Sequence, residues 1–290
     1  MLRSLYSGIS GLRAHQTMMD VTGNNISNVN TVGYKAAATL FQDTMSQTVA
    51  TGGKPQVDAA LVPVRGGINA AQIGLGVKLA DIATNFRQGS QQPTGVGTDL
   101  MIQGDGFFVL DEAGQTLYTR SGGFHFDSDQ NLVAPNGAFV MGYAAGVVPA
   151  PGVALVPMTL NPASAVPAVT TEKMTSYTIS PTGEIIGQFD DDTPRSFGQI
   201  ATATFVNPNG LEKAGNSTYR SNAAVTGAAD LGAAGTGGRG PMTSGSLEMS
   251  NVDLAQEFTN LIVAQRGFQA NSRVITTSDE LLQELVNLKR

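Results

Sequence analysis

The sequence predicts a segregated α + β protein, in which a mainly β middle domain lies between long N- and C-terminal coiled-coil α-helices. Three observations predict it. Apolar residues repeat at heptad spacing at both ends of the chain, and short alternating apolar runs separated by turn signals fill the middle. Charged residues make up only 14% of the 290 residues, against about 25% in ordinary soluble domains. We expect an N-terminal coiled-coil helix over 1–34, an extended connector over 35–89, an all-β outer domain over 90–240 and a C-terminal coiled-coil helix over 241–290.

The first helix is predicted by an apolar stripe whose members follow steps of three and four residues, with Gln16 and Gly23 in the two missing positions. Gly23 is followed by Asn24 and Asn25, and these residue types adopt the left-handed conformations that end helices. We therefore expect the first regular helix to stop near Gly23. The stripe consists of Leu2, Leu5, Ile9, Leu12, Met19 and Ile26.

The middle of the chain is predicted to be β. Alternating runs over 99–143 are separated by turn signals rich in Gly, Asp and Pro, which is typical of a chain of hairpins. A second set over 177–206 completes one sandwich or barrel-like domain. Residues 207–246 are rich in Gly, Ala, Ser and Thr, and we expect them to return as an extended strap. Residues 130–171 contain no charged side chain, so they are either partly an interface with neighbouring molecules or an uncharged, solvated linker.

The last helix is predicted by a second stripe that runs through five heptads. Ser250 and Asp253 form a capping box, and a helix over 250–290 would reach roughly 60 Å, longer than a domain of this size covers with its own core. We expect it to pack against the first helix, with Gly267 at a point of close approach. The apolar members of the stripe are Leu254, Phe258, Leu261, Phe268, Ile275, Leu282 and Val286.

Self-association follows from this pairing, because a pair of helices leaves apolar flanks uncovered. Those flanks hold Met18, Leu281, Leu285 and Leu288. In the alternative interpretation, both helices lie on a globular core as ordinary amphipathic elements.

Composition excludes several classes of protein. A net charge of −6 with no run of Lys or Arg argues against nucleic-acid binding. The chain has no cysteine, so disulfides and thiolate chemistry are excluded. No apolar run is long enough to predict a membrane span, and the N-terminus lacks the pattern of a cleaved secretory signal.

No catalytic constellation stands out. His15 and His125 are expected at the surface, and the G-x-G-x-x-G match over 235–240 lacks the preceding strand of a dinucleotide site. Residues 127–131 predict a turn in place of a calcium loop. The acidic run at 190–192 is interpreted as a solvated loop, with cation binding left open. We therefore predict no enzymatic activity, no cofactor, and no catalytic or metal site.

Both ends of the chain resemble the signatures of the bacterial flagellar axial proteins. The N-terminal segment SLYSGISGLRAHQTMMDVTGNNISNVNTVGYKA spans 4–36, and the C-terminal segment over 245–290 opens with GSLEMSNVDLAQEF. Between them, GLGVKLADIATNFRQGS over 74–90 and TDLMIQGDGFFVL over 98–110 resemble the hook branch of that family.

The resemblance implies a structural subunit of the flagellar hook, a self-assembling, flexible tube that transmits torque between rod and filament. The distal rod protein is the alternative, because it shares both terminal signatures. Many hook proteins are longer and carry an additional outer β-domain, whereas this chain has room for one. The resemblance further implies type III export without a cleaved signal and a place in the hook or basal body. The implied partners are the chain itself and the rod, hook–filament junction and hook-cap proteins, with no nucleic acid and no membrane insertion.

The resemblance also implies which residues mediate self-assembly, in a tube-lining layer of paired helices. In the N-terminal segment they are Leu5, Ile9, Leu12, Met19, Asn24, Asn25 and Ile26, and in the C-terminal segment Leu254, Phe258, Leu261, Phe268, Ile275, Leu282 and Val286. A rival from another class is a secreted β-domain that binds a glycan or protein through the acidic loop, with the helices as a trimerisation stalk. That rival predicts a closed oligomer, whereas an axial protein forms open tubes.

Overall fold

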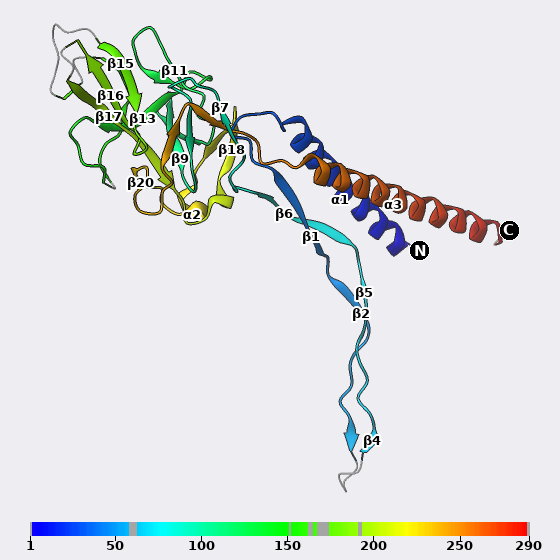
Figure 1. Ribbon diagram of the computed structural model, residues 1–290. Coiled ribbons are helices and arrows are strands. Elements are labelled where there is room, and N and C mark those ends of the chain that lie inside the picture. The colour runs from blue at the N-terminus through cyan, green and yellow to red at the C-terminus, as the bar shows by residue number, and fades with distance from the viewer. Residues whose placement is uncertain are drawn as a thin grey trace. The chain divides into compact units, whose positions relative to one another are not determined.

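A computed structural model of the chain divides into two compact units (Figure 1). Unit 1 contains Met1–Ile26, Ala37–Ala83 and Leu254–Arg290, and unit 2 contains Ser27–Ala36 and Thr84–Asp253. The structure describes residues 2–57, 63–150, 152–161, 165–166, 174–190 and 193–288. Each unit is therefore assembled from stretches that are far apart in the sequence.

Unit 1 contains two long helices, α1 (Leu2–Ser27) and α3 (Leu254–Leu288). The expectation that α1 stops near Gly23 is wrong, because the helix continues through Gly23 and Asn24. Asn25 is buried and is satisfied while helical: its Nδ2 donates to the carbonyl of Ala37 at 2.8 Å and its Oδ1 accepts from the amide of Ala37 at 3.0 Å. The asparagine therefore bonds a neighbouring strand and does not turn the backbone.

The helix α3 begins at Leu254, later than the predicted capping box at Ser250. Residues 246–248 form a strand of unit 2, and the side chain of Asn251 bonds the backbone at Ala36, Asn85 and Arg87. These bonds hold the segment before Leu254 in an extended path. The 35 residues of α3 reach about 52 Å at the α-helical rise. Neither long helix has an apolar stretch that would cross a lipid bilayer, in the part of the chain that the structure describes.

The strands between Ala37 and Thr84 pair as a two-stranded β-ribbon in unit 1. β1 pairs with β6, β2 with β5 and β3 with β4. An isolated two-stranded ribbon is marginally stable in water. This ribbon also leaves Leu40, Met45 and Val49 more than half exposed, so burial of its own apolar side chains stabilises it little. Its strands are β1 (Ala37–Asp43), β2 (Ser46–Ala50), β3 (Gln56–Val57), β4 (Pro63–Arg65), β5 (Ala71–Gly74) and β6 (Val77–Thr84).

Unit 2 consists mainly of β-strands. Among the described residues, 12 strands form one sheet with the central order β11-β12-β13-β17-β9-β10-β19-β18, and two short pairs, β8–β21 and β7–β22, stand beside it. A short α2 (Ala223–Thr226) and a 3₁₀ turn η2 (Pro208–Gly210) complete the unit. The strands are β7 (Gln91–Pro93), β8 (Leu100–Ile102), β9 (Phe107–Glu112), β10 (Gln115–Thr119), β11 (His125–Phe126), β12 (Leu132–Val133), β13 (Phe139–Ala144), β14 (Val156–Pro157), β15 (Met174–Ile179), β16 (Glu184–Phe189), β17 (Pro194–Thr204), β18 (Glu212–Gly215), β19 (Thr218–Arg220), β20 (Asp230–Ala233), β21 (Met242–Ser244) and β22 (Ser246–Glu248).

The central strand β9 is buried on both faces of the sheet. Phe107 and Val109 belong to one apolar cluster, whereas Phe108 and Leu110 belong to the other. Because successive side chains of a strand point to opposite faces, a run of apolar residues without alternation marks a strand that is covered on both sides. The run FFVL therefore places β9 between two cores.

The strap expected over 207–246 is a series of short paired strands. β19 pairs with β10 and β20 pairs with β17, while β21 and β22 pair with β8 and β7. Small side chains make these strands inconspicuous in the sequence, but each bonds a strand that precedes it by many residues. The residues predicted as a strap are thus part of the β-domain, where they pair with strands from earlier in the chain.

Tyr219 allows the β-domain to be tested at alkaline pH. It lies in the cluster with Phe86 and Phe107, at ring-centroid distances of 5.4 and 6.1 Å. Burial, aided by the nearby Tyr34, raises the pKa of Tyr219 well above 10.0. A group whose pKa is raised on folding contributes stability below its unfolded pKa, and this contribution is lost as the pH rises above that value. We expect Tyr219→Phe to move the midpoint of alkaline unfolding to higher pH, measured by circular dichroism. An unchanged midpoint would contradict the assignment.

Candidate self-assembly surface

The two long helices pack antiparallel through small residues. Ser4 lies against Ser278, Gly8 against Ile275 and Gly11 against Asn271, so positions rise along α1 as they fall along α3. A Cβ atom on Gly11 would lie 2.7 Å from the side-chain oxygen of Asn271, and one on Gly8 would lie 3.2 Å from Ile275. Glycine is therefore required where the helices touch.

Polar side chains complete the helix pair. The Oγ atoms of Ser4 and Ser278 are 3.4 Å apart, and at the other end Nδ2 of Asn25 donates to Oε1 of Glu257 at 3.1 Å. His15 lies against Gly267, where a Cβ atom would come within 2.5 Å of the imidazole. The expected surface position of His15 is thus wrong, because its ring fills the space that Gly267 leaves. Gly267 therefore lies at a point of close approach, as expected, but the group that approaches it is the side chain of His15 and not the backbone of α1.

Only part of the predicted apolar stripes lies in this interface. Ile275 contacts α1, Asn25 is buried, and Asn24 is exposed. The half-buried members are Leu5, Leu12, Met19, Ile26, Leu261 and Leu282. The exposed members are Ile9, Leu254, Phe258, Phe268 and Val286. The pairing of first with last helix therefore uses a face of small residues next to the stripes and leaves much of the stripes uncovered.

The uncovered side chains form two apolar flanks on α3. Leu254, Phe258 and Ile262 succeed one another at four-residue steps, with Phe258 50% and Ile262 57% exposed. Val274, Leu281 and Leu288 recur every seven residues on the other flank, and their exposed fractions rise from 41% to 82%. Exposed apolar patches of this extent mark interaction sites. Since these side chains are exposed in the part of the chain that the structure describes, the flanks are the candidate self-assembly surface.

The glycine contacts of the helix pair can be tested with Gly267→Leu. Leucine raises the intrinsic helix propensity by nearly 1 kcal/mol, so any loss of helix order must come from separation of α1 and α3. We expect the overpacking to weaken their pairing by about 1–3 kcal/mol, seen as faster amide hydrogen exchange in α1. Ala270→Leu, at an exposed position of the same helix, should leave exchange in α1 unchanged. Equal protection in both variants would rule out the close contact.

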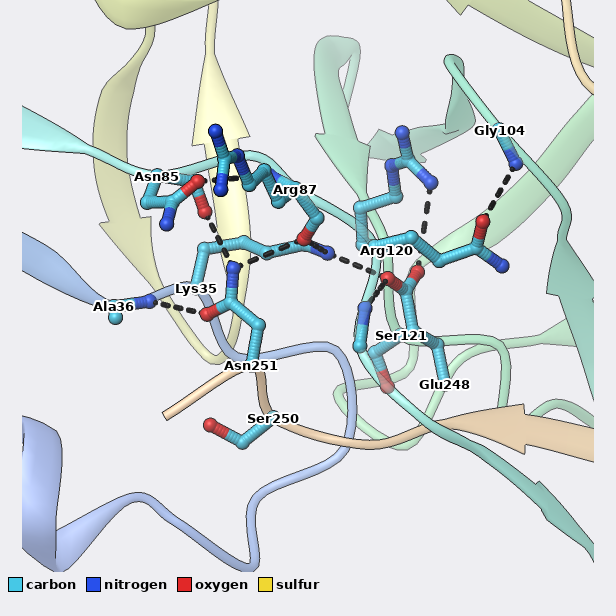
Figure 2. A network of polar contacts seen from close by, with 12 residues as sticks. Lys35, Ala36, Asn85, Arg87, Gly104, Arg120, Ser121, Glu248, Ser250 and Asn251 are labelled. Carbon is cyan, nitrogen blue, oxygen red and sulfur yellow. Dashed lines mark hydrogen bonds and ion pairs between the residues drawn. The ribbon is translucent and has the colours of Figure 1, made fainter. Parts of the chain in front are cut away.

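A buried ionic cluster lies in unit 2, among the stretches that lead to the helices and the ribbon. Figure 2 shows the carboxylate of Glu248 between Lys35 and Arg120. Nζ of Lys35 donates to Oε1 of Glu248 at 2.5 Å and to the carbonyl of Arg87 at 2.8 Å. The amide of Gly89 also donates to Oε1, at 2.9 Å. Lys35 follows α1, Gly89 follows the ribbon and Glu248 precedes α3, so the cluster joins these three stretches.

Burial governs the electrostatics of this cluster. The side chains of Lys35 and Glu248 are fully buried, and that of Arg120 is 2% exposed. Burial lowers the pKa of Lys35 and of Arg120, whereas the charge of Glu248 opposes both shifts. The guanidinium of Arg120 also lies 5.2 Å from the ring centroid of Phe107. Glu248 is therefore the residue on which the charge balance of the cluster depends.

The other residues singled out in the sequence have local roles. His125 is exposed, and Oδ1 of Asp127 accepts from the amides of Asp129 and Asn131, which confirms the predicted turn. Arg239, within the G-x-G-x-x-G match, pairs with Asp230 at 2.8 Å. Asp190 accepts from Thr175, while residues 191 and 192 lie outside the described residues. The described residues hold no group of three or more metal-ligating side chains.

Three family models match the chain. "Flagella basal body rod protein" matches residues 5–35, "Flagellar hook protein FlgE/F/G D1 domain" matches 101–187, and "Flagellar basal body rod FlgEFG protein C-terminal" matches 243–288. The first and last matches cover α1 and α3 with their adjoining segments, and the second covers much of the β-domain. The matched segments thus coincide with the helix pair and the sheet.

Relatives extend the similarity over the whole chain. A "Flagellar basal-body rod protein FlgG" of Bacillus subtilis is 44% identical over 290 residues, which is 100% of both chains. The FlgG of Borreliella burgdorferi is 36% identical over 292 residues, again 100% of both. A "Flagellar hook protein FlgE" of Borreliella burgdorferi is 31% identical in an alignment of 448 positions that covers 100% of both. The chain therefore belongs to the flagellar rod and hook protein family that contains FlgE, FlgF and FlgG.

Proposed function

We propose that this chain is the structural subunit of the distal part of the flagellar rod, and not the hook subunit that its sequence first resembled. The observation that carries the proposal is the end-to-end match to FlgG, at 44% identity over 290 residues. The alignment with the hook protein FlgE extends to 448 positions. That hook protein therefore carries segments for which this chain of 290 residues has no counterpart.

The structure supports a subunit that is completed by its neighbours. The helix α3 exposes apolar flanks along its length, and the ribbon exposes Leu40, Met45 and Ile73. Burial of apolar surface contributes about 25 cal/mol per Å², so these surfaces favour association of many copies. We propose that they stack into a tube of helices, inside the flagellum, with the β-domains outside it. The rod and hook proteins next to it in the flagellum and the type III export apparatus are its proposed further partners.

The rod and hook functions can be separated in the bacterium that encodes this chain. After deletion of the gene, isolated basal bodies should show a rod that stops short, with no hook attached, when viewed by electron microscopy. Restoring the gene should restore both. Basal bodies with a complete rod and only the hook missing would contradict the proposal and favour the hook function. Purified protein should form straight tubes above a threshold concentration.

A further inference from the structure

We propose that a groove between α1 and β6 receives the C-terminal turns of α3 from a second copy of this chain. The inference rests on the proposed function in one respect, since it assumes that the chain polymerises. Beyond the proposed function, the inference names the two surfaces that contact each other when one copy binds the next. The groove belongs wholly to unit 1, as do the turns that would fill it.

A hydrogen bond between α1 and the start of β6 defines one end of the groove. Oγ of Ser10 accepts from the amide of Val77 at 3.2 Å, which anchors the start of β6 beside α1. Gly76 has a φ of 132° and lies so close to Ser10 that any side chain there would clash. Beyond this anchor, the open groove between the two elements has a volume of about 410 Å³. The position of β6 beside α1, and with it the groove, is therefore fixed by contacts within unit 1.

The lining of the groove is apolar with a positive charge. Tyr6 and Ile9 from α1 and Leu79 from β6 line it, and all three are exposed, Tyr6 by 70%. Arg13 and Lys78 supply two cations, and none of the described residues that line the groove is acidic. A suitable occupant must therefore present an apolar edge together with carboxylates.

The C-terminal turns of α3 have these properties. Ser278 is opposite Ser4 near the start of α1, so residues 279–288 extend past the first described turn of α1 (Figure 1). Leu281, Leu285 and Leu288 share one edge and are 53%, 50% and 82% exposed. The same turns carry Asp279, Glu280 and Glu284, and the cations Lys289 and Arg290 follow them in the sequence. Glu280 and Glu284 lie closest to the leucine edge, since they are one and four residues from Leu281 and Leu288 on the helix.

Dimensions and direction also fit. The α1 residues that line the groove, from 6 to 17, span about 17 Å along the helix, and residues 279–288 span about 14 Å. Because α3 runs antiparallel to α1 and extends beyond its N-terminal end, the turns cannot fold back into the groove of their own chain. The contact must join different copies through different surfaces. Such heterologous contacts form rings when the rotation closes and open helical polymers when it does not, and the proposed tube requires the second case.

Cross-linking tests the contact directly, because the chain has no cysteine of its own. One chain carries Leu79→Cys with Leu285→Cys, and the control carries Leu79→Cys with Val263→Cys, another exposed apolar position of α3. A disulfide requires close Cα atoms, so oxidised polymers should give roughly tenfold more cross-linked chains in the first variant than in the control. Denaturing gels measure the ladder of cross-linked chains.

The outcomes separate this inference from the proposed function. If polymers form but the control cross-links equally or better, the groove holds another part of α3 and the inference is overturned. If the unaltered chain forms no polymer at any concentration, the proposed function fails as well.

Charge reversal gives a second test for the case in which a cysteine variant does not polymerise. Arg13→Glu with Lys78→Glu, or Glu280→Lys with Glu284→Lys, should each raise the threshold for polymerisation roughly tenfold. All four substitutions in one chain should return it towards the original value. A combined variant no better than the separate pairs would overturn the inference.

Discussion

Replacing Phe258 by aspartate will abolish polymerisation while the monomer stays folded. Phe258 is 50% exposed in the single chain, so its loss removes little internal packing. In a tube of helices, the new carboxylate would be buried without a partner, which costs several kcal/mol. We expect no sedimenting polymer even at roughly a hundredfold the normal threshold concentration, a change equivalent to about 2.7 kcal/mol. Analytical centrifugation measures the polymer, and circular dichroism checks the monomer.

The matched control is Thr259→Asp. Thr259 is the next residue on α3 and is exposed, and its hydroxyl donates to the carbonyl of Ala255 one turn earlier in the same helix. The aspartate of the Thr259→Asp variant adds the same charge, but it projects away from the flank that contains Phe258. Normal polymers from Thr259→Asp with none from Phe258→Asp would locate the contact on that flank. Normal polymers from both would exclude the flank from assembly, whereas an unfolded Phe258→Asp monomer would show that Phe258 serves the internal fold.

Glu248→Gln will destabilise the β-domain. Glutamine keeps the shape of the side chain but removes the charge that balances Lys35 and Arg120, both of which are buried. Breaking a buried ionic cluster in this way costs about 3–5 kcal/mol. For a unit of this size, the melting temperature should fall by roughly 10 °C. Thermal unfolding followed by circular dichroism measures the change.

Glu212→Gln serves as the comparison, because Glu212 is exposed in the same unit. It should melt within a degree or two of the unaltered chain, since exposed charges contribute little. If the two variants melt together, the cluster around Glu248 contributes no more than a surface charge. Glu248→Gln should also weaken polymerisation less than Phe258→Asp does, because Glu248 acts within one chain.

The sequence was a good guide to the two helices and a poor guide to the face they share. Heptad spacing identifies α1 and α3 because apolar residues at that spacing mark one side of a helix. The pairing, however, uses Gly8, Gly11 and Gly267. Gly267 was expected at a close approach, but Gly8 and Gly11 were not, because glycines carry no hydrophobic signal that distinguishes them. Several stripe residues stay exposed in the single chain.

The buried ionic cluster could not be predicted from the sequence. Lys35 and Glu248 are 213 residues apart, and a single charge in each segment resembles any surface charge. Their one distinguishing feature is that each lies among uncharged neighbours, in GYKAAAT and SGSLEMS. The strands over 207–246 were missed for a related reason, since small residues in short runs depend on distant partners for their conformation.

The buried ion pair of Lys35 and Glu248 affects when the β-domain can finish folding. Lys35 is synthesised 213 residues before its counter-ion Glu248, so a nascent chain that stops between the two holds an ammonium group without its carboxylate. Completion of the β-domain must therefore wait until β22 arrives, and contacts of such high sequence separation form slowly. A chain cut off before Glu248 should therefore stay open and sensitive to proteases, whereas a chain that includes β22 should resist them.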